Sequence, residues 1–249
     1  MNDLDPVVQR GASGTRPDRT LDLHRGRRFP AEVIGHAVCH VFSLSLRDVE
    51  LLLAERGVIV SYETIRRWSQ KFGRNLADRL RRRRSKPDDT WHLDEMFLQI
   101  NGEQHDLWRA VDQHGVVLDI LVQDRRNALA AKRFFKRLLH GLQYKPRRIV
   151  TDGLRSYGVA HRDIMPDVRH CQSRYLNNRA ENSHRPTRRE RQMQRFKSSA
   201  QAQRLLSAQD IIYGHFRPRR RLVTAHHYRR VRAKAFRIWQ QEPCVQMNP

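Results

Sequence analysis

The sequence is poor in the features that mark disulfide-rich, secreted or membrane proteins. Its 249 residues include only three cysteines, Cys39, Cys171 and Cys244, which are odd in number and far apart. This excludes a disulfide scaffold and is typical of a protein in a reducing cytosol. No apolar run approaches the roughly 18 residues of a membrane span, and residues 1–28 lack the apolar core of a secretory signal. We therefore expect a cytoplasmic protein with no membrane partner.

Acidic residues are also scarce. The chain has 26 Asp and Glu against 49 Lys and Arg, which gives a formal net charge of +23. An excess of this size repels itself unless a polyanion relieves it, so it favours nucleic acid as the partner. Charge alone would equally suit a solvated basic face or a ribosomal-type protein. Hydrophobic residues make up 39% of the chain, which is enough to form the core of one large domain or two small ones.

Residues 29–75 have the pattern of an all-α helix-turn-helix domain, and we expect residues 1–28 before them to be a disordered tail. Ser45 and Ser61 are typical helix N-caps, and Gly57 ends the helix between them. The third helix carries basic residues outside its apolar positions, as a DNA-recognition helix does. An ordinary helical hairpin would show the same apolar spacing. The residues expected to face a DNA major groove are Tyr62, Glu63, Thr64, Arg66 and Arg67.

A change of character near Pro87 predicts a domain boundary, with residues 76–90 as a basic linker. Beyond it, Asn101-Gly102 is a strong hairpin signal between two strand-like segments. Strands are expected over 91–100, 105–112, 116–122, 148–151 and 168–171, and helices over 128–139, 154–164, 178–195 and 200–216. This order predicts an α/β domain over 91–216 with a ribonuclease-H-like fold, a mixed five-stranded sheet with flanking helices. A basic C-terminal helix and tail are expected over 217–249.

Three carboxylates are placed to meet in such a fold. Asp94 lies within the first strand, Asp152 ends the fourth, and Glu181 begins the helix after the fifth. Three carboxylates brought together repel one another, so they imply a metal; two Mg²⁺ ions suit the cleavage of a phosphodiester. Each residue alone also has an ordinary explanation as a turn or helix-start residue. The pattern does not choose Asp94 over the neighbouring Glu95, and Asp112 and Asp119 also lie in or beside strands.

Several longer motifs resemble the transposases of bacterial insertion sequence family six. They are Trp91-His92-Leu93-Asp94-Glu95, Leu107-Trp108-Arg109-Ala110-Val111-Asp112, Leu154-Arg155-Ser156-Tyr157-Gly158, Asn177-Asn178-Arg179-Ala180-Glu181-Asn182-Ser183-His184 and Arg195-Phe196-Lys197-Ser198. The likeness extends from about residue 29 to residue 241, and the motifs occur in the family's order.

The resemblance implies an Asp-Asp-Glu transposase in which Asp94, Asp152 and Glu181 are catalytic and hold two Mg²⁺ ions, with Mn²⁺ as an alternative. It implies cutting of insertion-sequence ends and joining to target DNA, typically by replicative transposition through cointegrates. Double-stranded DNA is then the partner, as terminal inverted repeats and as target, for a homodimer or larger assembly in the bacterial nucleoid. The residues expected to bind DNA, besides those of the helix-turn-helix, are Arg188, Arg189, Arg195 and Lys197.

This chain also departs from the family pattern. Only 28 residues, 153–180, separate Asp152 from Glu181, which leaves Glu190 as an alternative third carboxylate. Gly153 stands where relatives usually carry lysine. Relatives have two more residues near Cys39. We therefore expect the apolar face of the first helix to be misaligned, and this copy of the transposase to be weakly active.

Two other functions remain open on the residues. One is a catalytically silent helix-turn-helix protein derived from a transposase, which would bind DNA without needing metal. The other is a metal-dependent nuclease or integrase of the same fold, which would lack specificity for inverted repeats.

Overall fold

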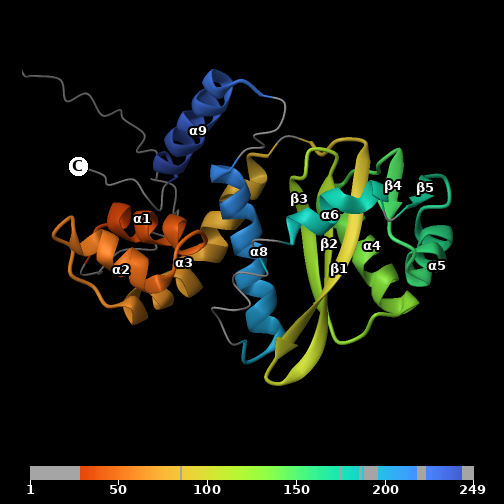
Figure 1. Ribbon diagram of the computed structural model, residues 1–249, viewed down its shortest axis with the longest axis horizontal. Helices are drawn as coiled ribbons and strands as arrows, with labels where there is room; N and C mark the ends of the chain where they lie inside the picture. Colours follow the sequence, from red (N-terminus) through yellow and green to blue (C-terminus); the bar gives the residue numbers. More distant parts are fainter. Residues whose placement is uncertain are drawn as a thin grey trace, which may run out of the picture.

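The computed structural model describes residues 29–242, except for 85, 174, 185–186, 188–195 and 218–222. Figure 1 shows a helical part, a sheet covered on both faces, and one long helix between them. The helices are α1 (Ala31–Val41), α2 (Leu46–Ala54), α3 (Tyr62–Arg82), α4 (Ala128–Leu142), α5 (Arg155–Ile164), α6 (Asn178–Ser183), α8 (Ser199–Phe216) and α9 (Ala225–Gln240), with a 3-10 turn η1 (Tyr175–Asn177). Within these described ranges, no helix combines the length and apolar character needed to cross a membrane.

The sheet has the order expected of a ribonuclease-H-like fold. Its strands are β1 (Thr90–Ile100), β2 (Glu103–Asp112), β3 (Val117–Gln123), β4 (Arg148–Thr151) and β5 (Arg169–Gln172), arranged β3-β2-β1-β4-β5. β1, β2 and β3 form an antiparallel meander, and β4 and β5 run parallel to β1. Asn101 and Gly102 both adopt positive φ, 51° and 85°, so the predicted hairpin turn is confirmed. The fold class predicted from the sequence is therefore confirmed.

Buried apolar side chains divide into three clusters. One lies between the sheet and the helices α4 and α5, and includes Trp91, Trp108, Phe134, Phe135 and Tyr157. A second lies between the opposite face of the sheet and α8, and includes Met96, Leu98, Ile100, Leu107 and Leu206. The third holds α1, α2 and α3 together and also takes in residues of α8 and α9, among them Ile211, Ile212, Phe216, Ala235 and Trp239. The helix α8 therefore belongs to both parts of the molecule, because its opposite sides are buried in different cores.

The helix-turn-helix begins as its capping residues predict. The side chain of Ser45 accepts a hydrogen bond from the backbone N–H of Asp48, whose carboxylate accepts one from the Ser45 N–H in return. Ser61 caps α3 in the same way, and Gly57 takes a φ of 74° in the turn that precedes it. The first helix does not have a misaligned apolar face: α1 buries Ile34, Ala37, Val38 and Val41 at helical spacing, so that prediction is wrong.

Replacing Ser45 by alanine is expected to lower the free energy of unfolding by about 1 kcal/mol, because the backbone N–H of Asp48 at the start of α2 loses its side-chain partner. Urea denaturation measures this loss. Ser43→Ala removes a hydroxyl that caps no helix and should change the value by less than about 0.5 kcal/mol. Equal losses in the two variants would contradict the capping role.

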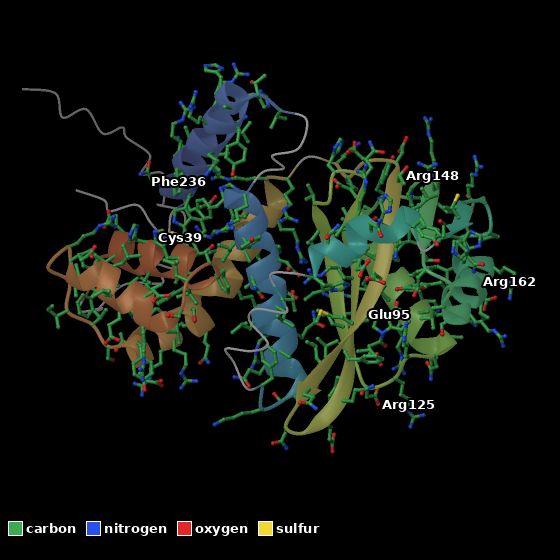
Figure 2. The ribbon with its side chains drawn as sticks, viewed as in Figure 1. Cys39, Glu95, Arg125, Arg148, Arg162 and Phe236 are labelled. Atoms are coloured by element: carbon green, nitrogen blue, oxygen red, sulfur yellow. The ribbon has the colours of Figure 1, made fainter. Side chains whose placement is uncertain are left out.

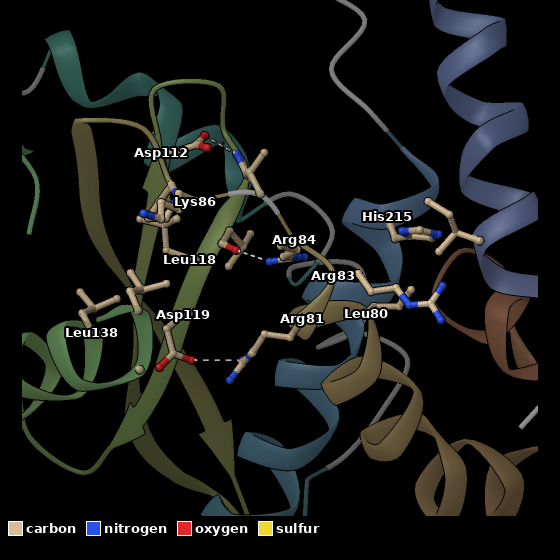
Figure 3. Close-up of a pocket in the computed structure, with 16 residues that line it drawn as sticks. Leu80, Arg81, Arg83, Arg84, Lys86, Asp112, Leu118, Asp119, Leu138 and His215 are labelled. Atoms are coloured by element: carbon tan, nitrogen blue, oxygen red, sulfur yellow. Dashed lines mark hydrogen bonds and ion pairs between the residues drawn. The ribbon is translucent and has the colours of Figure 1, made fainter. Parts of the chain in front are cut away.

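The first half of the segment expected to be a basic linker is helical. α3 continues to Arg82, because Leu76, Ala77 and Leu80 extend the apolar face that begins at Ile65. Its basic residues then line a cavity of about 430 Å³ between the end of α3 and the strand β3 (Figure 3).

The basic residues at this cavity connect the helical part of the molecule to the sheet. The half-buried Arg84 donates hydrogen bonds to the carbonyl of Val117 on β3, at 2.7 Å, and of Ile211 on α8, at 3.4 Å. Arg81 pairs with Asp119 at 3.5 Å (Figure 3). These contacts use, within the protein's own structure, arginines that the charge pattern alone would have assigned to a DNA-binding surface.

The helix predicted over 178–195 is described only in part. α6 ends at Ser183, and Pro186 in the sequence explains the end, because proline has no N–H for a continued helix. Three predicted DNA-binding residues, Arg188, Arg189 and Arg195, lie outside the described residues.

Candidate active site

The parallel pairing of β1 and β4 brings two of the predicted carboxylates together. His92 is the register partner of Val150, so Asp94 and Asp152, each two residues further on, lie side by side. One carboxylate oxygen of each, together with one of Glu95, falls within a set of atoms that are all within 4.8 Å of one another. The sequence pattern did not choose between Asp94 and Glu95, and the structure puts both in this carboxylate cluster, which we define as Asp94, Glu95 and Asp152.

The cluster is electrostatically unfavourable without a cation. Burial, and next the charge of Asp152, raises the pKa of Asp94 from 3.8 to about 7, and the charge of Glu181 adds to this. Burial also raises the pKa of Glu95 to about 7, although a hydrogen bond from Tyr157 opposes the shift. Carboxylates held this close favour a bound divalent cation, which removes their mutual repulsion.

Glu181 lies beside the cluster but is not one of its members. It is exposed on α6, near enough for its charge to raise the pKa of Asp94. The alternative third carboxylate, Glu190, lies outside the described residues.

Glu95 is fixed by two partners that the sequence did not single out. Its carboxylate accepts a hydrogen bond of 2.7 Å from the Tyr157 hydroxyl and pairs with Arg126. The guanidinium of Arg126 also lies 3.9 Å from Asp152 and stacks over the exposed ring of Phe97. Glu95 lies at the centre of the sheet region in Figure 2. Glu95 thus holds the cationic side chain of Arg126 next to Asp152, and nothing in the local sequence signals that Arg126 would reach it.

The opposite side of Asp94 is supported by residues from α6 and β2. His184 is fully buried, and its Nε2 lies 3.2 Å from the Asp94 carboxylate. Arg109, the register partner of Asp94 on β2, is also fully buried and donates to the carbonyl of Ser183. The same guanidinium donates to the Thr187 hydroxyl at 2.5 Å and to both carboxylate oxygens of Asp210 on α8.

These contacts tie the segment that follows Glu181 to the strand beside Asp94. Arg109 stands inside a motif that the sequence shows, but pattern alone assigned it no role. The partners of Arg109 are 74 to 101 positions away along the chain.

The α3 residues predicted to contact DNA differ in their exposure and in their partners within the protein. Tyr62 and Arg67 are exposed, and both arginines pair with Glu63, Arg66 at 2.6 Å and Arg67 at 3.5 Å. The Thr64 hydroxyl lies 3.1 Å from that of Ser61, at the helix start.

Lys197 is exposed at the far end of the β1–β2 hairpin. Its neighbour Phe196 pairs with Ile100, six residues along β1 from Asp94. Lys197 is therefore distant from the carboxylate cluster, on the order of 20 Å along the strand.

A second group of metal-ligand types was missed in the sequence. His36, Cys39 and His40 on α1 have ligand atoms within 4.8 Å of one another, and the His-x₃-His spacing was the available signal. Arg56 contacts the Nε2 of His36. Burial, and then the charges of His40 and Arg56, lowers the pKa of His36 to about 4. A guanidinium on the ligand nitrogen disfavours a metal at this position.

Comparisons with known proteins show the family to which the chain is related. A family model described as a DDE domain matches residues 88–218. The chain is 32% identical over 209 residues to the transposase for the insertion sequence-like element IS431mec of Staphylococcus aureus strain Mu50, covering 81% of this chain and 92% of that one. The transposase for element IS257 in transposon Tn4003 of Staphylococcus aureus matches with the same identity and coverage.

Solved structures give weaker similarities. The catalytic core of BIV integrase is 15% identical with a TM-score of 0.35, covering 48% of this chain and 82% of that one. The HTLV-2 integrase core in complex with magnesium is 17% identical with a TM-score of 0.33, covering 39% and 66%. These scores are low, and the fold assignment rests on the order and direction of the strands.

Proposed function

Because the chain belongs to the Asp-Asp-Glu transposases of bacterial insertion sequence family six, we propose that it cuts insertion-sequence ends and joins them to target DNA by a replicative, cointegrate-type reaction. The observation that carries the proposal is the meeting of Asp94, within β1, and Asp152, just after the end of the neighbouring parallel strand β4. Two adjacent carboxylates with a glutamate beside them form a site for in-line displacement at a phosphodiester.

The donor set fits divalent metal ions. It offers only carboxylate oxygens, and the raised pKa of Asp94 reflects burial and the repulsion that a cation would relieve. Asp94, Asp152 and Glu181 would hold two Mg²⁺ ions, and Mn²⁺ suits the same oxygen ligands. Ions bound there would neutralise the charge on the attacking and leaving oxygens.

The chain's own residues orient this set. Arg126 lies between Glu95 and Asp152 and limits the rotation of both carboxylates. Asp152 also accepts a hydrogen bond of 3.0 Å from the backbone N–H of Leu154, which fixes one of its oxygens. Arg109 anchors the segment after Glu181, so α6 stays over the site.

Recognition of DNA is assigned to both parts of the molecule. The helix-turn-helix, through Tyr62, Thr64, Arg66 and Arg67, would read the terminal inverted repeats, with Arg66 released from Glu63 when DNA binds. Holding two element ends at once calls for a homodimer or larger assembly, working on the DNA of the bacterial nucleoid. Arg188, Arg189, Arg195 and Lys197 would hold DNA phosphates through their positive charge.

A strand-transfer assay tests the function. The purified chain is mixed with a labelled duplex of the element's inverted repeat, a target plasmid and Mg²⁺. We expect joined product that disappears with EDTA and in Asp152→Asn, which keeps the shape of the side chain. Glu181→Gln should also lose joining, whereas Glu190→Gln should retain it; the reverse would make Glu190 the third carboxylate.

The alternatives predict other results in the same assay. Specific binding of the repeat with no joining under any metal condition would make the chain a silent DNA-binding protein. Metal-dependent cutting of DNA with and without the repeat would make it a nuclease.

A further inference from the structure

A cavity of about 410 Å³ opens on the same face of the sheet as Asp94. Its lining residues come from four segments and are Thr90, His92, Gln113, His114, Arg148, Val150, Leu176 and Arg179. Side chains alternate between the two faces of a strand, so His92 and Asp94 point to the same face, about 6.6 Å apart along β1. Arg148 lies at the start of β4, near the upper edge of the sheet in Figure 2.

The cavity is basic. None of the described residues that line it is acidic, and two arginines, Arg148 and Arg179, are exposed at it. His114 also lines it and pairs with Asp88 at 2.8 Å. The two guanidinium groups therefore place positive charge on the face of the sheet that carries Asp94, where a polyanion must approach for reaction.

A buried polar atom in the cavity is left without a partner. His92 is 6% exposed, and its Nδ1 has no hydrogen-bond partner among the described residues. Arg148 and Arg179 line the same cavity, and an unfilled polar position beside guanidinium groups is suited to an oxyanion.

The rim of the cavity presents apolar and aromatic surface. Tyr175 is 88% exposed and Leu176 60% exposed, on the turn η1. The side chain of Asn177 donates a hydrogen bond of 2.8 Å to the Leu93 carbonyl, so this turn is fixed to β1 beside Asp94. An exposed ring held next to a basic cavity is the combination that binds a nucleic-acid strand, with phosphate in the groove and base on the ring.

We propose that this cavity binds a DNA phosphate next to the one that reacts, with Arg148 and Arg179 as its contacts, and that Tyr175 stacks on an adjacent base. The inference rests on the proposed function, since it places the substrate strand across the carboxylate cluster. It adds a subsite that lies before Asp94 on β1, away from the helix-turn-helix.

The test uses binding in EDTA, so that it does not depend on catalysis. A set of inverted-repeat duplexes is prepared. In each duplex one phosphate is replaced by a neutral methylphosphonate, and the replaced phosphate is a different one of those within three positions of the reacting phosphate. We expect one such duplex to bind the wild-type chain several-fold more weakly than the unmodified duplex. Arg148→Gln/Arg179→Gln should bind both duplexes equally, because this variant has no guanidinium left to sense the phosphate charge. The matched control Arg162→Gln, on α5, should keep the wild-type difference.

Salt dependence gives a second measure of the same interaction. The slope of log affinity against log salt should fall by about 0.9 for each phosphate that the double variant can no longer bind, and stay unchanged in Arg162→Gln. The subsite would be overturned if the methylphosphonate weakened binding equally in wild type and the double variant, and if the two proteins had the same slope of log affinity against log salt. Loss of binding to inorganic phosphate or a free nucleotide, with DNA binding unaltered, would also overturn it in favour of a small-molecule site.

The stacking contact is tested separately. Tyr175→Ala should bind the repeat at least about five-fold more weakly, and Tyr175→Phe should restore the affinity, because stacking needs the ring and not the hydroxyl. Equal affinity of Tyr175→Ala and wild type would remove Tyr175 from the subsite. A chain that fails to join DNA in Mg²⁺ yet shows these binding effects would refute the transposase proposal and leave the subsite standing.

Discussion

Replacing Asp94 by asparagine is expected to abolish DNA joining while making the metal-free protein more stable. Asp94 would be a ligand of the ions that neutralise the reacting phosphate, a contribution of several kcal/mol, so joining should fall at least about a thousand-fold. The same carboxylate is repelled by Asp152 and penalised by burial, and asparagine removes both costs.

The sign of the stability effect depends on pH. The pKa of Asp94 is raised to about 7 in the folded state from an ordinary value of 3.8, and that of Glu95 from 4.5 to about 7. A group with a raised folded pKa contributes stability that is present below its unfolded pKa and is lost as pH rises through the folded pKa. Metal-free wild type should therefore lose stability between about pH 4 and pH 8, and Asp94→Asn should lose less. At pH 8 the variant should be more stable by a few kcal/mol, with about 4 kcal/mol as the ceiling.

Urea denaturation in EDTA at pH 5 and pH 8 measures the difference in stability between wild type and Asp94→Asn. Thermal unfolding at increasing Mg²⁺ concentration then measures how far the metal stabilises each protein. Mg²⁺ should stabilise wild type at pH 8 and have much less effect on Asp94→Asn, because a ligand is gone. Asp124→Asn, at an exposed carboxylate outside the cluster, should match wild type in joining and in its response to Mg²⁺. A variant that joins DNA normally, or is less stable than wild type at pH 8 in EDTA, would remove Asp94 from the metal site.

The arrangement of the two aspartates was predictable because it follows from strand order. Asp94 in the first strand and Asp152 at the end of the fourth become neighbours in any sheet with the order found here. The turn at Asn101-Gly102 fixed the register of the meander, since both residues tolerate positive φ. The turn was predictable because it depends on two residues that are adjacent in the sequence.

The rest of the site depends on contacts that local patterns do not contain. Glu95 is held by Arg126 and Tyr157, which follow it by 31 and 62 positions, and no spacing rule links them. The extent of α3 is a different case. Leu76 and Leu80 continue the helical period through the basic run, so α3 extends to Arg82, beyond the domain end predicted at residue 75.

Replacing Arg109 by methionine is expected to cost about 3–5 kcal/mol of unfolding free energy, the usual effect of breaking a buried ion pair. Arg109 is fully buried, and its removal leaves Asp210 buried without its cation. The effect should be far larger than that of Arg137→Met, which breaks a partly exposed pair with Asp119 and should cost at most about 1 kcal/mol. Urea denaturation compares the two.

A double variant separates stability from the positioning of the active site. Arg109→Met/Asp210→Leu replaces both charges by apolar groups, so most of the stability should return. The carbonyl of Ser183 and the hydroxyl of Thr187 still lack their donor, so the segment after Glu181 is no longer tied to the strand that carries Arg109. Joining should therefore remain at least about ten-fold below wild type, although the protein is folded.

The concentration of Mg²⁺ needed for half-maximal joining gives a readout that a purely structural role would not change. It should rise in the double variant, because a loosely held Glu181 binds metal less well, and stay at the wild-type value in Arg137→Met. Arg109→Lys should not rescue either property, since an ammonium cannot reach Asp210, Thr187 and Ser183 together as the planar guanidinium does. If the double variant joined DNA at the wild-type rate and Mg²⁺ concentration, Arg109 would serve the fold alone. The expected separation, with stability restored and joining impaired, follows from one guanidinium that bonds both a buried carboxylate on α8 and the segment that follows Glu181, the proposed third carboxylate.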